Sequence, residues 1–426
     1  MAASLRYETV VAKVFPRFIF RCLVVALLAC GAGIVAESGS PTASEKQTKK
    51  KDPPKPAYSI PMRGIGFREP LFERAVTGRF PISLNFFTPD RLLFTFNTKG
   101  LLARNVEHCD GPYDDDQLVH AALISLPDGK PIEEAQWQLH DHERYIWPVH
   151  GGVLLRRCHV FELLQDSLTG HRILDFPARP VLVLTSPDGR SIVVETLHEK
   201  HSPEEHKRLT EQAMRGDGLI PSEDIDITII SLDYARVIGR ASQRAPVYVP
   251  IVRDGFYNIL PAQHNRWQIM FQSIPGEPKE VTKVDSNCQP ALSPLADDVF
   301  VLATCVSNLN YHVLIAYDRT GKELWRDEWL NNLSRPAFAF AADNRRFAVA
   351  TVRTSFANNG FGILDGFSAR TEDITVYSTY KGEPLLSISV SPPFATGQNF
   401  ALSPDGSQLA VLNHGVIEVY NVSEGK

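Results

Sequence analysis

Two stretches decide the fold: residues 181–196, VLVLTSPDGRSIVVET, and residues 399–412, NFALSPDGSQLAVL. In both, an apolar run meets Ser-Pro-Asp-Gly, and alternating apolar residues resume directly afterwards. Proline holds φ at about −65°, aspartate caps the turn with its side chain, and glycine accepts the left-handed conformation. Each stretch is therefore predicted to form a tight β-hairpin. The predicted turn residues are Pro187, Asp188 and Gly189 in the first hairpin, and Pro404, Asp405 and Gly406 in the second.

The same strand–turn–strand pattern recurs along the chain. Degenerate copies occupy residues 83–96, 145–156, 247–260, 290–304 and 336–352, so that seven turns fall near residues 88, 150, 186, 253, 293, 342 and 403. A second family of turns lies between them, as in residues 316–325, AYDRTGKELW, with Asp318, Gly321 and Trp325. Alternating inner and outer hairpins are typical of four-stranded blades. The pattern predicts an all-β, seven-bladed β-propeller of four-stranded antiparallel blades; a sandwich or a two-domain chain is the alternative.

The SPDG units resemble the WD40-like and TolB-type propeller repeats of exported bacterial proteins. The decamer of residues 316–325 resembles the docking motif of quinoprotein propellers. This resemblance implies a structural glycine and tryptophan, with the ring wedged between blades, and pyrroloquinoline quinone as the family's cofactor. Only one good copy of the decamer is present, with no adjacent cysteine pair, and no Gly-His and Trp-Asp pairs recur as in genuine WD40 blades. We therefore predict the fold without a cofactor.

Two further elements complete the predicted domain of residues 58–426. Residues 63–81 precede the first inner hairpin and are predicted to add an outer strand to the last blade, because an open ring would leave unpaired strand edges. Ser202, Pro203 and Glu205 match a helix start, with Ser202 as the N-cap. A short helical insertion is therefore predicted near residues 202–215.

The first 36 residues are predicted to be a signal peptide or a membrane anchor. Four basic residues between Arg6 and Arg21 precede fifteen uncharged residues, Cys22 to Ala36, which is the pattern of a secretory signal. An uncleaved anchor and lipidation of Cys30 in a loose lipobox are the alternatives, and they are the only membrane contact predicted. Residues 37–57 are rich in Ser, Thr, Lys and Pro and are predicted to be a flexible tether.

Cysteine usage agrees with export to a periplasm, a cell surface or the medium. Four cysteines remain beyond the signal-like segment, and outside a reducing compartment they favour two structural disulfides. Three pairings are possible, of which Cys109–Cys158 with Cys288–Cys305 is the local one. Free buried thiols are the alternative.

No catalytic, cofactor-binding or metal site is predicted. Two histidine groups are interpreted as solvated segments: His140, His142 and His150, and His198, His201 and His206. The acidic loop of Asp110, Asp114, Asp115 and Asp116 is interpreted in the same way. The tryptophans are interpreted as inter-blade core, and they are Trp137, Trp147, Trp267, Trp325 and Trp329.

The charge balance excludes one class of partner. Residues 1–56 hold nine Lys or Arg and four acids, so the rest of the chain carries 35 bases and 45 acids. An acidic body offers no electrostatic footprint for nucleic acid.

Two hypotheses of function follow. The first is a non-enzymatic scaffold that presents a surface or a central funnel to a protein or small ligand. The second is an exported hydrolase or lyase with its site at the funnel mouth. Titratable side chains that converge at the mouth without partners would favour the enzyme.

Overall fold

The structure of the 426-residue chain is a computed structural model, which divides into two compact units, Met1–Pro53 and Pro54–Lys426. It describes residues 53–70, 82–100, 116–139, 144–176, 180–198, 208, 224–244, 249–307, 310–328, 336–354, 369–394 and 398–424. The second unit contains all the strands given below.

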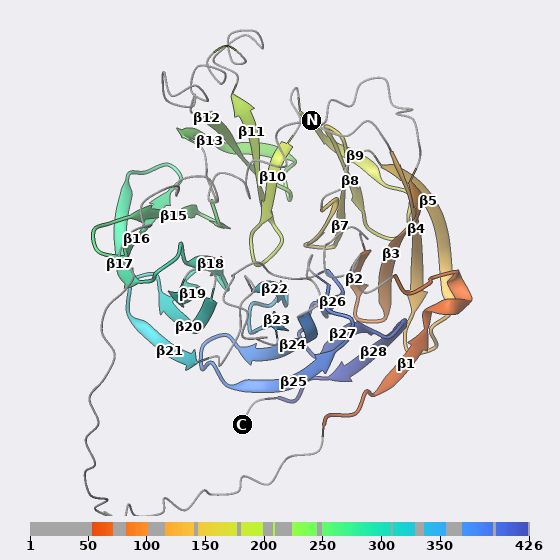
Figure 1. Cartoon of the computed structure of the whole chain (residues 1–426). Helices are drawn as coiled ribbons and strands as arrows, with labels where there is room; N and C mark the ends of the chain where they lie inside the picture. The colour runs from red at the N-terminus through yellow and green to blue at the C-terminus, as the bar shows by residue number, and fades with distance from the viewer. Residues whose placement is uncertain are drawn as a thin grey trace, which may run out of the picture. The chain divides into compact units, whose positions relative to one another are not determined.

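The second unit is built from seven four-stranded antiparallel sheets, which confirms the predicted fold class (Figure 1). Blade 1 comprises β2 (Ile82–Thr88), β3 (Arg91–Gly100), β4 (Gln117–Ser125) and β5 (Pro131–Leu139); blade 2 comprises β6 (Ile146–Val149), β7 (Gly152–Arg157), β8 (Val160–Leu164) and β9 (His171–Asp175); blade 3 comprises β10 (Pro180–Thr185), β11 (Ser191–His198), β12 (Asp224–Ser231) and β13 (Arg236–Arg244). Blade 4 comprises β14 (Ile251–Val252), β15 (Gly255–Pro261), β16 (Arg266–Ser273) and β17 (Pro278–Asp285); blade 5 comprises β18 (Ala291–Pro294), β19 (Val299–Ser307), β20 (Asn310–Asp318) and β21 (Glu323–Glu328); blade 6 comprises β22 (Ala337–Phe340), β23 (Arg346–Thr354), β24 (Ala369–Ser378) and β25 (Pro384–Val390); blade 7 comprises β26 (Phe400–Leu402), β27 (Gln408–Asn413), β28 (Val416–Asn421) and β1 (Tyr58–Pro61).

The hairpin turns follow the local chemistry of the sequence. In the β10–β11 turn the Asp188 carboxylate accepts hydrogen bonds from the Ser186 hydroxyl at 2.6 Å and from the Arg190 N–H at 3.0 Å, and Gly189 has φ +66°. The β26–β27 turn repeats this pattern, with Asp405 accepting from the Ser403 hydroxyl at 2.6 Å. These bonds need only residues within the turn, which is why the motif is visible in the sequence.

The ring closes by pairing of the first and last strands of the propeller, as predicted, but through a different segment. Strand β1 pairs antiparallel with β28, with Tyr58 opposite Val419 and Pro61 opposite Val416, and Figure 1 shows the first strand beside the last. The predicted closing strand at residues 63–81 is therefore wrong. Met62–Ile65 forms a short 3-10 helix (η1) in which Met62 is 1% exposed, and residues 71–81 lie outside the described part. The four residues of β1 all pair with β28, which is six residues long.

Among the described residues, the hydrophobic core forms seven clusters, each shared by two neighbouring blades. One cluster joins blade 7 to blade 1, the next joins blade 1 to blade 2, and the series continues around the ring to blades 6 and 7. Trp137, Trp147 and Trp325 lie in three of these clusters and Trp267 packs against a fourth, in agreement with the core role predicted for them. Trp329 lies outside the described residues.

Cys288 and Cys305 form a disulfide with a Cα–Cα distance of 5.6 Å, which is the local pairing predicted for them. Cys109 lies outside the described residues, so its pairing with Cys158 stays a prediction. The same holds for the helical insertion near residues 202–215, of which the structure describes Arg208 alone. Within the described ranges, no helix is long and apolar enough to cross a membrane.

Candidate functional site

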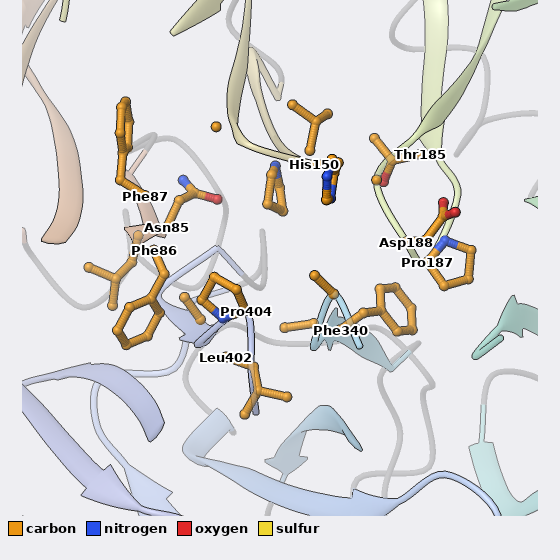
Figure 2. Close-up of a pocket in the computed structure, with 18 of the residues that line it drawn as sticks. Asn85, Phe86, Phe87, His150, Thr185, Pro187, Asp188, Phe340, Leu402 and Pro404 are labelled. Atoms are coloured by element: carbon orange, nitrogen blue, oxygen red, sulfur yellow. The ribbon is translucent and has the colours of Figure 1, made fainter. Parts of the chain in front are cut away.

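A cavity of about 360 Å³ lies among the innermost strands of the propeller, at the end that carries the β2–β3 and β10–β11 turns. We call this end the turn face. Figure 2 shows the cavity ringed by side chains from blades 1, 2, 3, 6 and 7. The lining segments are residues 83–89 of β2 and its turn, Arg144 and residues 148–152 around β6, residues 185–189 after β10, residues 338–340 and Ala342 around β22, and residues 398, 400–402 and 404 around β26.

Apolar side chains form most of the wall. Phe338 and Phe340 are two residues apart on β22, so they project to the same side of the strand, and their rings stack with centroids 6.2 Å apart. Figure 2 shows Phe86 and Leu402 on other sides of the same opening. A concave, largely apolar site of this kind is typical of ligand pockets.

The polar groups of the wall near blade 1 bond to one another. The Asn85 side-chain amide donates to the Ser83 hydroxyl at 2.6 Å, and both residues are buried. The Leu84 N–H donates to the carbonyl of Gln398 at 2.8 Å, which links β2 to the segment that leads into β26. These contacts fix the wall between blades 1 and 7.

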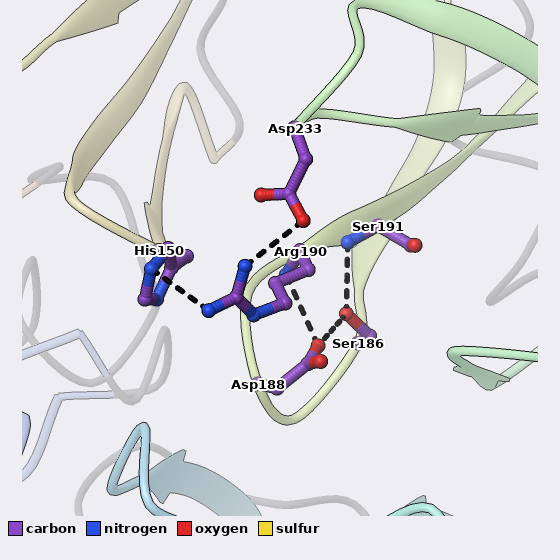
Figure 3. Close-up of polar contacts among 6 residues, drawn as sticks. All are labelled: His150, Ser186, Asp188, Arg190, Ser191 and Asp233. Atoms are coloured by element: carbon purple, nitrogen blue, oxygen red, sulfur yellow. Dashed lines mark hydrogen bonds and ion pairs between the residues drawn. The ribbon is translucent and has the colours of Figure 1, made fainter.

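A charged cluster borders the cavity between blades 2 and 3 (Figure 3). Arg190 contacts the Asp233 carboxylate at 2.9 Å and the Nε2 atom of His150 at 3.0 Å. Because a guanidinium has only donors, His150 Nε2 is the acceptor in this contact. Asp188 is held by its own turn, as described above. The cluster therefore positions polar groups at the rim, and its charged members are already engaged with one another.

A second charged cluster lies on the turn face between blades 4 and 5. Arg319 donates to both carboxylate oxygens of Asp254, each at 2.8 Å, and these hydrogen bonds hold the pKa of Asp254 below its usual value. The guanidinium also lies over the Phe271 ring, 4.6 Å from its centroid. Asp297 accepts from the Arg253 N–H at 3.1 Å, and burial raises its pKa. This cluster joins two blades and does not line the cavity.

Two buried carboxyls lie between blades. Burial raises the pKa of Glu195, on β11, to about 8, although the carboxylate accepts a hydrogen bond from the backbone of Val249. Burial likewise raises the pKa of Glu372, on β24, to about 7. Each residue is 1% exposed. Sequence reasoning missed both, because burial of a single glutamate within an alternating strand has no local signal.

Part of the predicted turn motif reaches the cavity. Pro187, Asp188, Gly189 and Pro404 line it, although the sequence assigned them only a structural role. Asp405 and Gly406 belong to the same turn as Pro404. The aromatic wall was missed, and its signal was the Phe-Phe pair at 86–87 and the Ala-Phe-Ala-Phe run at 337–340.

The quinoprotein-like decamer lies away from the cavity. Asp318 accepts hydrogen bonds from the backbone N–H of Thr320 and of Lys322, and Gly321 has φ +85°. Trp325 is 9% exposed and packs against blade 6, where its indole N–H donates to the Thr379 carbonyl at 2.8 Å. The decamer thus forms a turn and an inter-blade wedge.

Of the predicted solvated segments, the structure describes two members in detail. His150 is exposed, as expected, whereas Asp116 is 0% exposed and accepts from the Gln138 amide at 2.6 Å. The interpretation of Asp116 as solvated is therefore wrong. Asp116 directly precedes β4, and its buried carboxylate is hydrogen-bonded to Gln138 of the neighbouring strand β5. No group of three or more His, Cys, Asp or Glu suited to a metal ion occurs among the described residues. The side chains of the other histidines and acids of these groups lie outside them.

Neither a protein-family model nor a curated protein sequence matches the chain. Among solved structures it is similar to the acylaminoacyl peptidase of Pyrococcus horikoshii, with 11% identity and a TM-score of 0.47, over 83% of this chain and 53% of the peptidase. It is also similar to Hsv2 of Kluyvelomyces marxianus, with 14% identity and a TM-score of 0.35, over 64% of this chain and 70% of Hsv2. A Listeria monocytogenes protein matches with 10% identity and a TM-score of 0.35, over 79% of this chain and 74% of that protein. The chain spans about half the length of the peptidase, and at these identities the likeness is one of fold alone.

Proposed function

We propose that this chain is an exported, non-enzymatic binding scaffold that holds an apolar ligand group in the cavity of its turn face. The observation that carries the proposal is the cavity itself, which has aromatic and aliphatic walls and opens beside the turns. Burial of an apolar group there would be favoured by about 25 cal/mol per Å² of surface removed from water.

The titratable side chains of the lining support binding over catalysis. They are Arg144, His150 and Asp188, and each already has a polar contact within the protein. Arg144 donates from Nε to the Ile146 carbonyl at 2.9 Å, and the contacts of the other two are given above. A general acid or base must reach the proton of a substrate at hydrogen-bond distance, and the contacts above direct these three groups toward protein partners. Groups engaged in this way serve better to shape the rim.

The test is a fluorescence titration of the full chain with N-phenyl-1-naphthylamine, an uncharged apolar dye. Ala342 is exposed and lines the cavity, so Ala342→Trp should fill its mouth without disturbing the core. We expect the dye affinity to fall at least about tenfold, which corresponds to about 1.4 kcal/mol of lost binding free energy.

The matched control is Ala262→Trp, which changes an exposed alanine of the β15–β16 turn outside the cavity lining. Its dye affinity should equal that of the wild type. Equal affinity in all three proteins would overturn the proposal, because the dye would then bind elsewhere. Once the cavity is established, native mass spectrometry of the protein from its source would separate a small molecule from a side chain of a partner protein.

A further inference from the structure

Glu372 of blade 6 is directly bonded to the segment that forms one wall of the cavity. Its carboxylate accepts a hydrogen bond from the Asn399 side-chain amide at 2.7 Å and one from the Phe394 N–H at 3.3 Å. Gln398 and Phe400, the neighbours of Asn399 in the chain, both line the cavity. The position of Asn399 therefore sets the position of two wall residues.

Asn399 also connects this wall to the sheets on either side. Its carbonyl accepts a hydrogen bond from the Leu412 N–H of β27 at 2.8 Å, and the carbonyl of Gln398 accepts from the Leu84 N–H of β2 at 2.8 Å. Blades 6, 7 and 1 thus meet at these two residues. A change in the Glu372–Asn399 contact would therefore alter the positions of Gln398 and Phe400 in the cavity wall, because both are bonded to Asn399 along the chain.

Asn399 is 0% exposed, and its Oδ1 atom has no hydrogen-bond partner among the residues that the structure describes. A neutral carboxyl offers one O–H donor and one acceptor, whereas a carboxylate offers acceptors only. In the neutral form Oε2 of Glu372 can still accept from Asn399 Nδ2, and the carboxyl gains an O–H that is available to Asn399 Oδ1. Ionised Glu372 leaves Oδ1 without a donor, and a buried unsatisfied acceptor destabilises the arrangement.

The surroundings of Glu372 also favour its neutral form. Val352 on β23 and Val390 on β25 stand opposite it in the sheet, and the segment contributes the amide of Asn399 and the Phe394 N–H. Among the described residues, the charged group that acts on Glu372 is Asp373, the next residue of the same strand, whose negative charge raises the pKa of Glu372. Burial makes the larger contribution and brings this pKa to about 7.

We infer that the Glu372–Asn399 pair is a proton-dependent latch of the cavity wall, which holds the wall in its ligand-binding arrangement when Glu372 is protonated and releases it when Glu372 ionises. This inference rests on the proposed function. It makes ligand binding stronger in mildly acidic than in mildly alkaline solution. If only the protonated form binds, the apparent dissociation constant rises by the inverse of the protonated fraction, which is up to about tenfold at pH 8 for a pKa of about 7.

The experiment measures the affinity of the full chain for N-phenyl-1-naphthylamine between pH 5.5 and 8.5 at constant ionic strength. The wild type should bind up to about tenfold more weakly at pH 8 than at pH 6. Glu372→Gln carries a permanently neutral amide that can donate to Asn399 Oδ1 and accept from Nδ2. It should bind at all pH values as the wild type does at pH 6.

Two variants serve as controls. Asp373→Asn removes the neighbouring charge and should shift the transition to lower pH without abolishing it. Glu195→Gln neutralises a second buried glutamate, away from this wall, and should retain the wild-type profile. A flat profile in the wild type, or an unchanged profile in Glu372→Gln, would overturn the latch while leaving the cavity function intact.

Hydrogen exchange separates failure of the latch from failure of the proposed function. The amides of Leu84 and Leu412 donate to the carbonyls of Gln398 and Asn399. After correction for the intrinsic pH dependence, they should be less protected above pH 7 in the wild type and equally protected in Glu372→Gln. Absence of dye binding at every pH would overturn the cavity function, and unchanged protection would independently overturn the latch.

Discussion

The wedge formed by Trp325 yields a quantitative prediction. Its indole stacks on the rings of Phe347 and Tyr377, with centroids 6.1 Å away in each case, and its N–H donates to the Thr379 carbonyl at 2.8 Å. Thr379 is 0% exposed. Trp325→Phe keeps an aromatic ring in the wedge and removes only the donor and part of the apolar surface.

The cost follows from these two losses. Leaving a buried acceptor without its donor costs about 1–3 kcal/mol. The smaller ring gives up about 1 kcal/mol of apolar burial. Trp325→Phe should therefore lower the free energy of unfolding by about 2–4 kcal/mol.

Trp267→Phe is the matched control, because the Trp267 indole N–H makes an equivalent bond to the Ser286 carbonyl at 2.9 Å from a half-buried position. Ser286 is 3% exposed, so its carbonyl also loses a buried donor, but the half-buried ring of Trp267 gives up less apolar burial than the ring of Trp325. Trp267→Phe should therefore cost about 1–3 kcal/mol, which is the cost of the unsatisfied acceptor alone. Urea unfolding followed by far-ultraviolet circular dichroism, with the slope compared between variants, measures both. If Trp325→Phe costs no more than Trp267→Phe, the deeper burial of the Trp325 ring does not add to the stability of the wedge.

Three further substitutions test the fold. Gly382 has φ +65°, and an added Cβ would collide with the Trp325 ring, whereas Gly415 has φ +73° and open space around it. Gly415→Ala should cost about 1–2 kcal/mol from the left-handed backbone alone, and Gly382→Ala clearly more, as measured by urea unfolding; equal costs would contradict the collision. The folded pKa of Glu195, about 8, lies above its usual 4.5, so the wild type loses stability relative to Glu195→Gln as pH rises from 4.5 to 8. The melting-temperature difference should grow over that range and then level off, corresponding to about 5 kcal/mol; a constant difference would refute it.

Most of the fold could be predicted because its signals are local. The Ser-Pro-Asp-Gly turns are stabilised by bonds between residues two to five apart, such as Ser186 with Asp188 and with the Ser191 N–H. Alternating apolar residues then specify strands whichever blade they join. Seven inner hairpins and the outer hairpins between them therefore follow from the sequence alone.

The sequence predicted that a strand near the start of the domain would complete the last blade, but it placed that strand at the wrong residues. The need to cover an edge of blade 7 is a general property of propellers, whereas the choice of residues depends on register. Ile60 pairs with Ile417 and belongs to the cluster shared by blades 7 and 1, and this long-range packing selects Tyr58–Pro61. Nothing in the local pattern distinguishes that segment from its neighbours.

The sequence by itself determined the turns, the strand pattern and the number of blades, since each depends on residues close together in the chain. Only the tertiary structure decided the cavity, because its wall combines Phe86, Phe340 and Leu402 from blades that lie far apart in sequence. It also decided the burial of Glu372 against Asn399, which requires blades 6 and 7 to be packed together. Turn chemistry acts over a few residues, whereas a cavity and a buried carboxyl exist only once the ring has closed.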